Sequence, residues 1–188
     1  MVSGGTRTRT RLLDAGRLLI SHHGFAGMGI NELLQAANVS RGSFYHHFES
    51  KEGLGLELLR ECFDVCFSGL RGLEDAPRLD SFTLWLRDLF ARCLDELRLI
   101  AQLSAECPSL PSRMQSELVA SNERSLGMLA SCIGGLATEQ RQPAGLRQRA
   151  VILYGLWLGM ALLSKSLDRA DPLQSAMVAT QDLLSFSA

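Results

Sequence analysis

The chain has 188 residues, of which 46% are hydrophobic and 21% are charged, and its formal net charge at pH 7 is −1. This length fits one compact domain or a small domain joined to a larger one, and the hydrophobic fraction is ample for a buried core. The five cysteines are odd in number and lie in helical patterns, which argues against a secreted disulfide framework.

The ends and the apolar runs give no sign of export or of a membrane. The first residues, MVSGGTRTRTR, are polar, unlike a secretory signal. The longest apolar run, 150–163, is shorter than the roughly 18 residues that suggest a membrane span. We therefore expect a cytoplasmic protein that does not associate with a membrane.

Charge is distributed unevenly along the chain. Residues 1–51 carry six Lys/Arg against three Asp/Glu, and all four histidines lie in the same part. The remainder is acidic overall. Such an asymmetry predicts a basic module that faces a polyanion.

The first three predicted elements are short helices. A helix over about 6–23 should end at Gly24 in a left-handed conformation, after which Phe25 turns into the core. Apolar residues at helical spacing predict a second helix near 30–37. After a turn at residues 38–39, Ser40 can cap a third helix over 41–48. Together these elements describe a helix-turn-helix unit.

The rest of the chain predicts a larger helical body. Ser50 can cap a helix over about 51–73, and further helices are expected over 81–94, 97–106, 111–138 and 146–167, with a last one starting at Pro172. We find no alternating pattern typical of strands. The prediction is an all-α chain of about nine helices, with a helix-turn-helix domain over 1–50 and a larger helical domain over 51–188.

The third helix has two distinct faces. At about 100° per residue, Phe44 and Phe48 lie on one side, and the residues that point outward or sideways are Gly42, Ser43, Tyr45 and His46. Small residues let a helix enter the major groove closely, and Arg41 can reach a guanine edge or a phosphate. Tyr45 and Lys51 are expected to contact phosphates.

The segment LLDAGRLLISHHGFAGMGINELLQAANVSRGSFYHHFESKEGL resembles the DNA-binding domain of the TetR family of bacterial repressors, and GSFYHHFESKE is its most specific part. The resemblance implies a DNA-binding domain over 1–50, with recognition by the third helix and phosphate contacts from Tyr45 and Lys51. It also implies an effector-binding and dimerisation domain over 51–188, with a homodimer formed by the last two helices. Asn31 stands near the position where the family often has a threonine that touches phosphate, so Asn31 or backbone amides would substitute for it.

The C-terminal body is similar to the NemR-type branch in LSAECPSL and ILYGLWLGM. Members of that branch respond to reactive electrophiles through cysteine. This chain has Arg98 where the principal sensing cysteine would stand, so Cys107, which ends a short helix before Pro108, becomes the candidate sensor.

Several aromatic side chains of the body either line an effector cavity or fill a core, and helical spacing does not separate these alternatives. With Cys107, the candidate pocket residues are Phe63, Phe67, Trp85, Phe90 and Trp157, accompanied by Phe82. The pairs His22–His23 and His46–His47 favour capping or phosphate contact over metal binding, because adjacent helical residues diverge and neither pair has a ligand one turn away. We expect no metal and no cofactor.

The last two helices carry the predicted dimer interface. Gly155 and Gly159 form a step that allows close helix contact, and Leu173 and Met177 continue an apolar face on the last helix.

These features predict a homodimeric repressor that leaves a palindromic, double-stranded DNA operator when an effector binds. The alternative within this class is a redox or electrophile sensor that uses Cys107. An enzyme is not expected, because no catalytic motif occurs. A purely structural helical dimer would not need the surface from Arg41 to Lys51, and salt-dependent DNA binding would separate it from a regulator.

Overall fold

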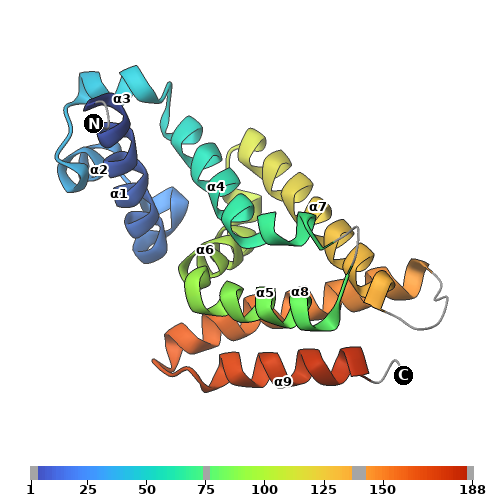
Figure 1. The fold of residues 1–188 in the computed structure, drawn as a ribbon. Coiled ribbons are helices and arrows are strands. Elements are labelled where there is room, and N and C mark those ends of the chain that lie inside the picture. The colour runs from blue at the N-terminus through green and yellow to red at the C-terminus, as the bar shows by residue number, and fades with distance from the viewer. Residues whose placement is uncertain (1–3, 74–76, 137–142, 186–188) are drawn as a thin grey trace. The chain divides into compact units, whose positions relative to one another are not determined.

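The computed structural model describes residues 4–73, 77–136 and 143–185 (Figure 1). These ranges form nine α-helices, a short 3₁₀ turn at Cys107–Ser109 and no strand, which confirms the all-α prediction. The helices are α1 (Gly4–Gly27), α2 (Ile30–Ala37), α3 (Arg41–His47), α4 (Lys51–Arg71), α5 (Leu79–Arg92), α6 (Leu94–Ala105), α7 (Ser112–Leu136), α8 (Pro143–Ser166) and α9 (Asp171–Ser185).

The chain divides into two compact units. Unit 1 consists of Met1–Cys62 and Gln102–Val119, and unit 2 of Phe63–Ala101 and Ala120–Ala188. Helices α4, α6 and α7 each contribute residues to both units. The domain boundary that the sequence predicts after residue 50 separates the DNA-binding segment from the rest of the chain. This division by function is distinct from the two compact units, and it stays a prediction.

Helix α1 is broken near its end by Gly24. This residue has φ 73° and ψ 170°, so the predicted positive φ is confirmed, but ψ is extended instead of left-handed helical. The helix does not end at Gly24 as predicted, and one more turn follows as far as Gly27. Phe25 is buried, as expected from the sequence.

Two side chains in and just after α6, those of Gln102 and Glu106, bond to the backbone of α1 around this break. The Phe25 backbone N–H donates to the Glu106 carboxylate at 2.9 Å. The Gln102 side-chain amide donates to the Ile20 carbonyl at 2.8 Å and to the other Glu106 oxygen at 3.2 Å. Because buried backbone groups must be paired, this segment fixes the end of α1 within unit 1.

The turn between α2 and α3 is built as the sequence predicts. Asn38 adopts the left-handed conformation, with φ 48° and ψ 54°. The Ser40 hydroxyl accepts a hydrogen bond from the Ser43 backbone N–H at 3.2 Å, and Ser50 does the same for Gly53 at 3.0 Å. Both predicted N-caps are thus confirmed.

Helix α6 begins three residues earlier than the expected start at residue 97, and only Cys93 separates it from α5. Cys93 has φ −119° and ψ 21°, which is outside the helical range. Leucines at 86, 89 and 97 are buried on both sides of this break. The helix expected over 81–94 therefore ends at Arg92, and α6 starts directly after the break, whose place the helical spacing in the sequence did not indicate.

In unit 2, α8 and α9 pack along each other and α5 contacts α9 (Figure 1). The buried Trp157 indole N–H donates to the Thr180 hydroxyl at 2.9 Å, so the one polar atom of this ring is paired. Among the described residues, we find no helix that is both long enough and apolar enough to cross a membrane.

Gly24→Ala should lower the free energy of unfolding by about 1–3 kcal/mol, because a side chain at this φ is strained. Its Cβ would also lie 2.5 Å from a Glu106 carboxylate oxygen. Gly127→Ala is the matched control, since a Cβ on this exposed residue of α7 meets nothing within 4 Å and should stabilise the helix by about 0.5–1 kcal/mol. Urea unfolding measures both, and equal effects of the two variants would contradict the assignment.

Candidate nucleic-acid interface

Helix α3 presents an open polar face over a buried apolar one. Phe44 is 0% exposed and Phe48 is 3% exposed, whereas Tyr45 is 48% exposed. Arg41, Gly42 and His46 are exposed, and Ser43 is half-buried with its hydroxyl 3.0 Å from that of Ser40. A Cβ on Gly42 would meet no atom within 4 Å. The predicted division of the helix into a buried and an exposed face is therefore correct, and no other side chain covers the exposed face at Gly42.

Arg41 is held by a residue of the preceding helix. Its guanidinium donates to the Asn31 side-chain oxygen at 2.6 Å. The family resemblance implies that Asn31 or backbone amides substitute for a phosphate-binding threonine, and this hydrogen bond shows that Asn31 also orients Arg41. Both side chains are exposed, so both remain accessible to DNA.

Lys51 is the first residue of α4, and its side chain reaches the last turn of α1. Its ammonium donates to the Ala26 carbonyl at 3.3 Å and lies 4.7 Å from the centre of the Phe25 ring. Partial burial lowers the pKa of Lys51 below its ordinary value. These two contacts hold the Lys51 ammonium in one place near the N-terminus of α4.

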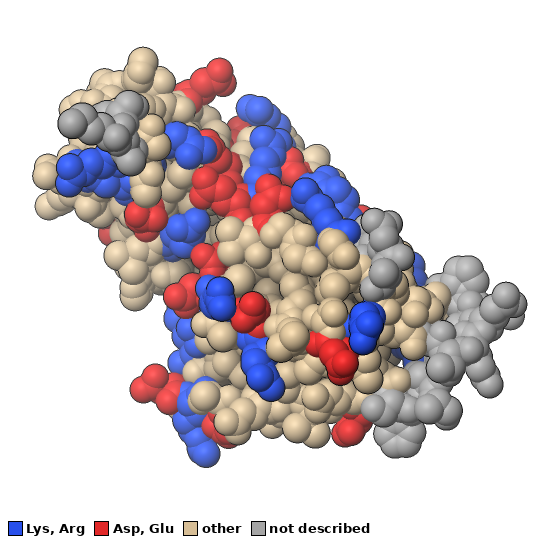
Figure 2. Space-filling model, in the orientation of Figure 1, with Lys and Arg blue, Asp and Glu red and all other residues tan. Residues whose placement is uncertain are grey.

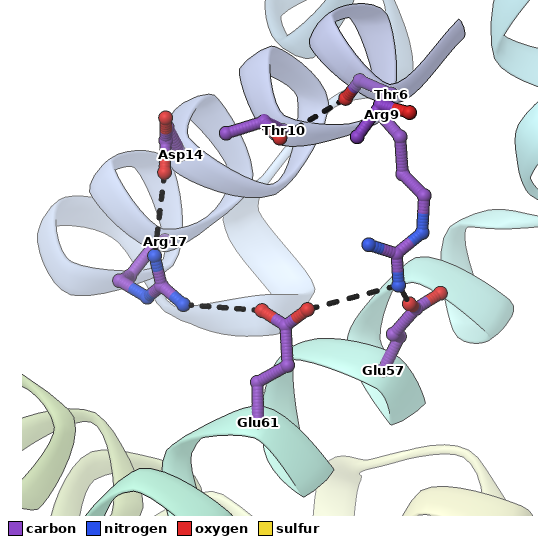
Figure 3. Close-up of polar contacts among 7 residues, drawn as sticks. All are labelled: Thr6, Arg9, Thr10, Asp14, Arg17, Glu57 and Glu61. Carbon is purple, nitrogen blue, oxygen red and sulfur yellow. Dashed lines mark hydrogen bonds and ion pairs between the residues drawn. The ribbon is translucent and has the colours of Figure 1, made fainter. Parts of the chain in front are cut away.

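Two arginines of α1 pair with α4, as Figure 3 shows. Arg9 forms ion pairs with Glu57 and, at 3.7 Å, with Glu61. Arg17 lies 3.3 Å from Glu61 and 3.4 Å from Asp14. Each glutamate is about one-third exposed, so these pairs position the two helices more than they stabilise the protein.

Several of the basic residues of the N-terminal segment therefore bond to other residues of unit 1. Besides Arg9 and Arg17, Arg11 donates to the Asn38 carbonyl at 2.8 Å and supports the turn before α3. On the face drawn in Figure 2, Lys and Arg side chains are interspersed with Asp and Glu. The charge count of the sequence overstated the number of cations that face solvent freely.

The predicted pocket aromatics of unit 2 form a continuous cluster. The Trp85 and Trp157 rings are 5.7 Å apart, the Phe63 and Phe67 rings 6.0 Å, and the Phe90 and Trp157 rings 6.5 Å. The cluster is almost entirely buried, and Trp85 is its half-buried member. The rings pack against one another, so in this conformation they fill the interior.

Tyr154 is a member of this cluster that the sequence reasoning missed. Its ring lies 5.5 Å from that of Phe67, and its hydroxyl donates to the Asn122 side-chain oxygen at 2.8 Å. Burial raises the pKa of the Tyr154 phenol, which therefore stays neutral and acts as a hydrogen-bond donor.

Cys107 does not belong to the aromatic cluster. It lies in unit 1, half-buried, directly after Glu106. Arg98, at the position of the missing thiol, donates to the Ala161 carbonyl at 3.1 Å and to the Ser164 hydroxyl at 2.9 Å. Arg98 thus joins α6 to α8 in unit 2.

An open groove of about 650 Å³ lies elsewhere in unit 2, on the surface of α5 and α9. Its lining residues are Leu79, Asp80, Thr83, Leu84, Gln181 and Asp182. None of them belongs to the predicted pocket. The described residues include no group of three or more His, Cys, Asp or Glu side chains able to hold a metal ion.

A short helix that exposes small and polar residues over two buried phenylalanines, reached by a tight turn from another helix, defines a helix-turn-helix DNA-binding protein. Residues 12–58 match the family model described as "Bacterial regulatory proteins, tetR family". The chain is also 30% identical over 193 residues to the HTH-type transcriptional repressor NemR of Escherichia coli K12, with 96% of each protein covered. The chain therefore belongs to the TetR family.

Further similarities agree with this assignment. The HTH-type transcriptional repressor DhaR of Mycobacterium sp. is 28% identical over 95% of this chain and 93% of its own length. The crystal structure of the reduced form of E. coli NemR superimposes with a TM-score of 0.74, at 29% identity, over 94% of this chain and 96% of that one. A TetR-family regulator from Agrobacterium tumefaciens has a TM-score of 0.78 at 18% identity, over 98% and 100% of the two chains, and shows the fold alone.

Gly42→Leu should lower operator affinity by roughly 100-fold or more, because the new side chain prevents close groove entry. Folding should be unaffected, since the position is open. Gly42→Ala is the same-site control and should retain most of the affinity. Fluorescence anisotropy with a labelled duplex measures binding, and normal affinity of the leucine variant would show that another face binds DNA.

Proposed function

We propose that the protein is a ligand-responsive transcriptional repressor that binds a palindromic operator as a homodimer and dissociates when an effector binds. The observation that carries the proposal is the open face of α3, which exposes Arg41, Gly42 and Tyr45 over the buried Phe44 and Phe48. The names of the relatives NemR and DhaR, both repressors, support it.

On this proposal, Arg41 reads a base edge or a phosphate while Asn31 fixes the direction of its guanidinium. Ser43 and His46 flank Gly42 and Tyr45 on the same helix and approach the groove walls. The Tyr45 hydroxyl and the Lys51 ammonium contact phosphates on the two sides of the helix. Each of these residues belongs to unit 1.

Salt dependence of DNA binding tests the phosphate contacts. Lys51→Ala should flatten the slope of log K against log salt by about one unit, because one fewer counterion is released. Tyr45→Phe should weaken binding to operator and unrelated DNA alike with an unchanged slope, since the hydroxyl is neutral. Arg71→Ala is the control, because this guanidinium pairs with Asp64 in unit 2 and should leave the slope unchanged. A wild-type slope for Lys51→Ala would remove Lys51 from the interface.

We propose that α8 and α9 form the dimer interface. Exposed apolar residues follow one another along α8, namely Val151, Ile152, Leu162 and Leu163, and Leu167 follows directly after its end; each is between 41% and 53% exposed. Gly155 and Gly159 lie between them, exposed and with no atom within 4 Å of an added Cβ. On α9, Leu173 and Met177 are half-buried and Val178 is 57% exposed. A second copy would cover this face.

Gly155→Leu should dissociate the dimer without unfolding the subunit, because a leucine fits the isolated chain but fills the space between two copies. Gly145→Leu is the matched control, since Gly145 is also an exposed α8 glycine with open space, outside the apolar run. Sedimentation equilibrium at micromolar concentration gives the oligomeric state. A Gly155→Leu dimer as stable as the wild type would exclude this interface.

For the effector, we propose a small molecule that enters unit 2 between the aromatic side chains and holds them in a second arrangement. Phe63, Phe67, Trp85, Phe90 and Trp157 offer ring faces to an apolar or aromatic ligand, and the half-buried Trp85 marks the accessible edge of the cluster. Repression ends because the effector binds better to the conformation that binds DNA less well.

Covalent sensing through Cys107 is a second candidate. Its supporting observation is that Cys107 is half-buried and directly follows Glu106, whose carboxylate accepts the Phe25 N–H. An adduct on Cys107 would therefore disturb the segment that fixes the end of α1. The two mechanisms differ in that only the covalent one requires a thiol at position 107.

A further inference from the structure

Two cysteines that are distant in sequence, Cys66 on α4 and Cys93 between α5 and α6, lie close together in unit 2. The Cys66 sulfur on α4 lies 4.0 Å from the backbone carbonyl oxygen of Cys93. In return, the Cys93 sulfur lies 3.8 Å from the carbonyl oxygen of Val65, the residue before Cys66. Each thiol therefore contacts the other cysteine or its direct neighbour, although 27 residues separate the two in sequence.

The local backbone favours a bond between these two thiols over one within α4. Cys62 and Cys66 lie one turn apart on the same helix, where Cβ atoms are about 5–6 Å apart and beyond the usual span of a disulfide. Cys93 is the single non-helical residue between α5 and α6, so its backbone can adjust without unwinding a helix. Cys66 is buried and Cys93 is half-buried, which gives an oxidant access from the Cys93 side.

We propose that Cys66 and Cys93 form an oxidation site at which a hydroperoxide converts the two thiols into an intramolecular disulfide. The Cys93 thiolate attacks the peroxide, the O–O bond breaks, and Cys93 becomes a sulfenic acid while the peroxide leaves as an alcohol after protonation. The Cys66 sulfur then attacks the Cys93 sulfur, and the hydroxide that leaves takes up the Cys66 proton as water. Two thiols are oxidised and one hydroperoxide is reduced to alcohol and water.

The charges around Cys93 make the first step slow at neutral pH. Burial raises the pKa of the Cys93 thiol, the Glu96 and Asp88 carboxylates raise it further, and Arg92 opposes them. Asp88 and Arg92 lie on α5, Glu96 on α6, and Cys66 on α4 with its sulfur 4.0 Å from the Cys93 carbonyl oxygen. Because the thiolate is the reactive form, the rate should still be rising at about pH 9, where an ordinary cysteine is more than half ionised.

Peptide mapping of the full chain tests the proposal. The reduced protein is treated with tert-butyl hydroperoxide, unfolded, alkylated with iodoacetamide and cleaved with trypsin and with a protease that cuts before aspartate. Cleavage before Asp64 separates Cys62 from Cys66, and cleavage after Arg92 releases Cys93. The expected product is one cross-linked peptide pair that contains Cys66 and Cys93, with Cys62, Cys107 and Cys132 alkylated.

Thermal unfolding gives an independent readout. The cross-link should raise the unfolding midpoint by roughly 5–10 °C, because it restricts the unfolded chain, and dithiothreitol should reverse the shift. Cys93→Ser should abolish both the cross-link and the shift, and folding should tolerate it because the side chain is half-buried. The control variant Cys107→Ser should retain both.

Three results would overturn the proposal. These are a cross-link that joins Cys62 to Cys66 or uses Cys107, a Cys93 that stops at the sulfenic or sulfinic acid while Cys66 is alkylated, and a cross-link formed between chains on a non-reducing gel. Because none of these readouts involves DNA, failure here is distinguishable from failure of the proposed repressor function.

Discussion

The break of α1 at Gly24 is the constraint on which the arrangement of unit 1 depends. A positive φ at this residue interrupts the helix, and at the break the Phe25 N–H donates to Glu106 while the Ile20 carbonyl accepts from Gln102. Phe25 can then enter the core, and its ring together with the Ala26 carbonyl fixes the Lys51 ammonium. The position of a predicted phosphate contact thus follows from the conformation of one glycine.

Electrostatics in unit 1 divides the basic residues into two groups. Arg9 and Arg17 pair with glutamates of α4, and Arg11 supports the turn before α3, so these three cations hold the helices in place. Arg41 lies at the start of α3 and Lys51 at the start of α4, and neither forms an ion pair with these glutamates. The interface proposed for DNA therefore relies on a few positioned cations, which fits a recognition helix better than a uniformly basic surface.

Local sequence signals predicted the local parts of this structure well. The positive φ of Gly24, the Ser40 and Ser50 caps, the turn at residues 38–39 and the burial of Phe44 and Phe48 all follow from residue type and helical spacing. Contacts between distant residues have no such signature: Glu106 lies 81 residues from Phe25, and Cys93 lies 27 residues from Cys66. The aromatic residues proposed for a pocket do lie together, but spacing did not indicate that Tyr154 would join them or whether the rings would fill the interior.

A hydroxyl-radical footprint on the DNA that flanks the protein's own gene tests the central claim, namely that two copies of α3 read a two-fold symmetric operator. We predict two protected blocks related by symmetry, with centres about 34–36 Å apart along the duplex, or a multiple of that distance. Protection should appear at the same protein concentration in both blocks. A single protected block, or uniform protection of any duplex regardless of sequence, would contradict the account.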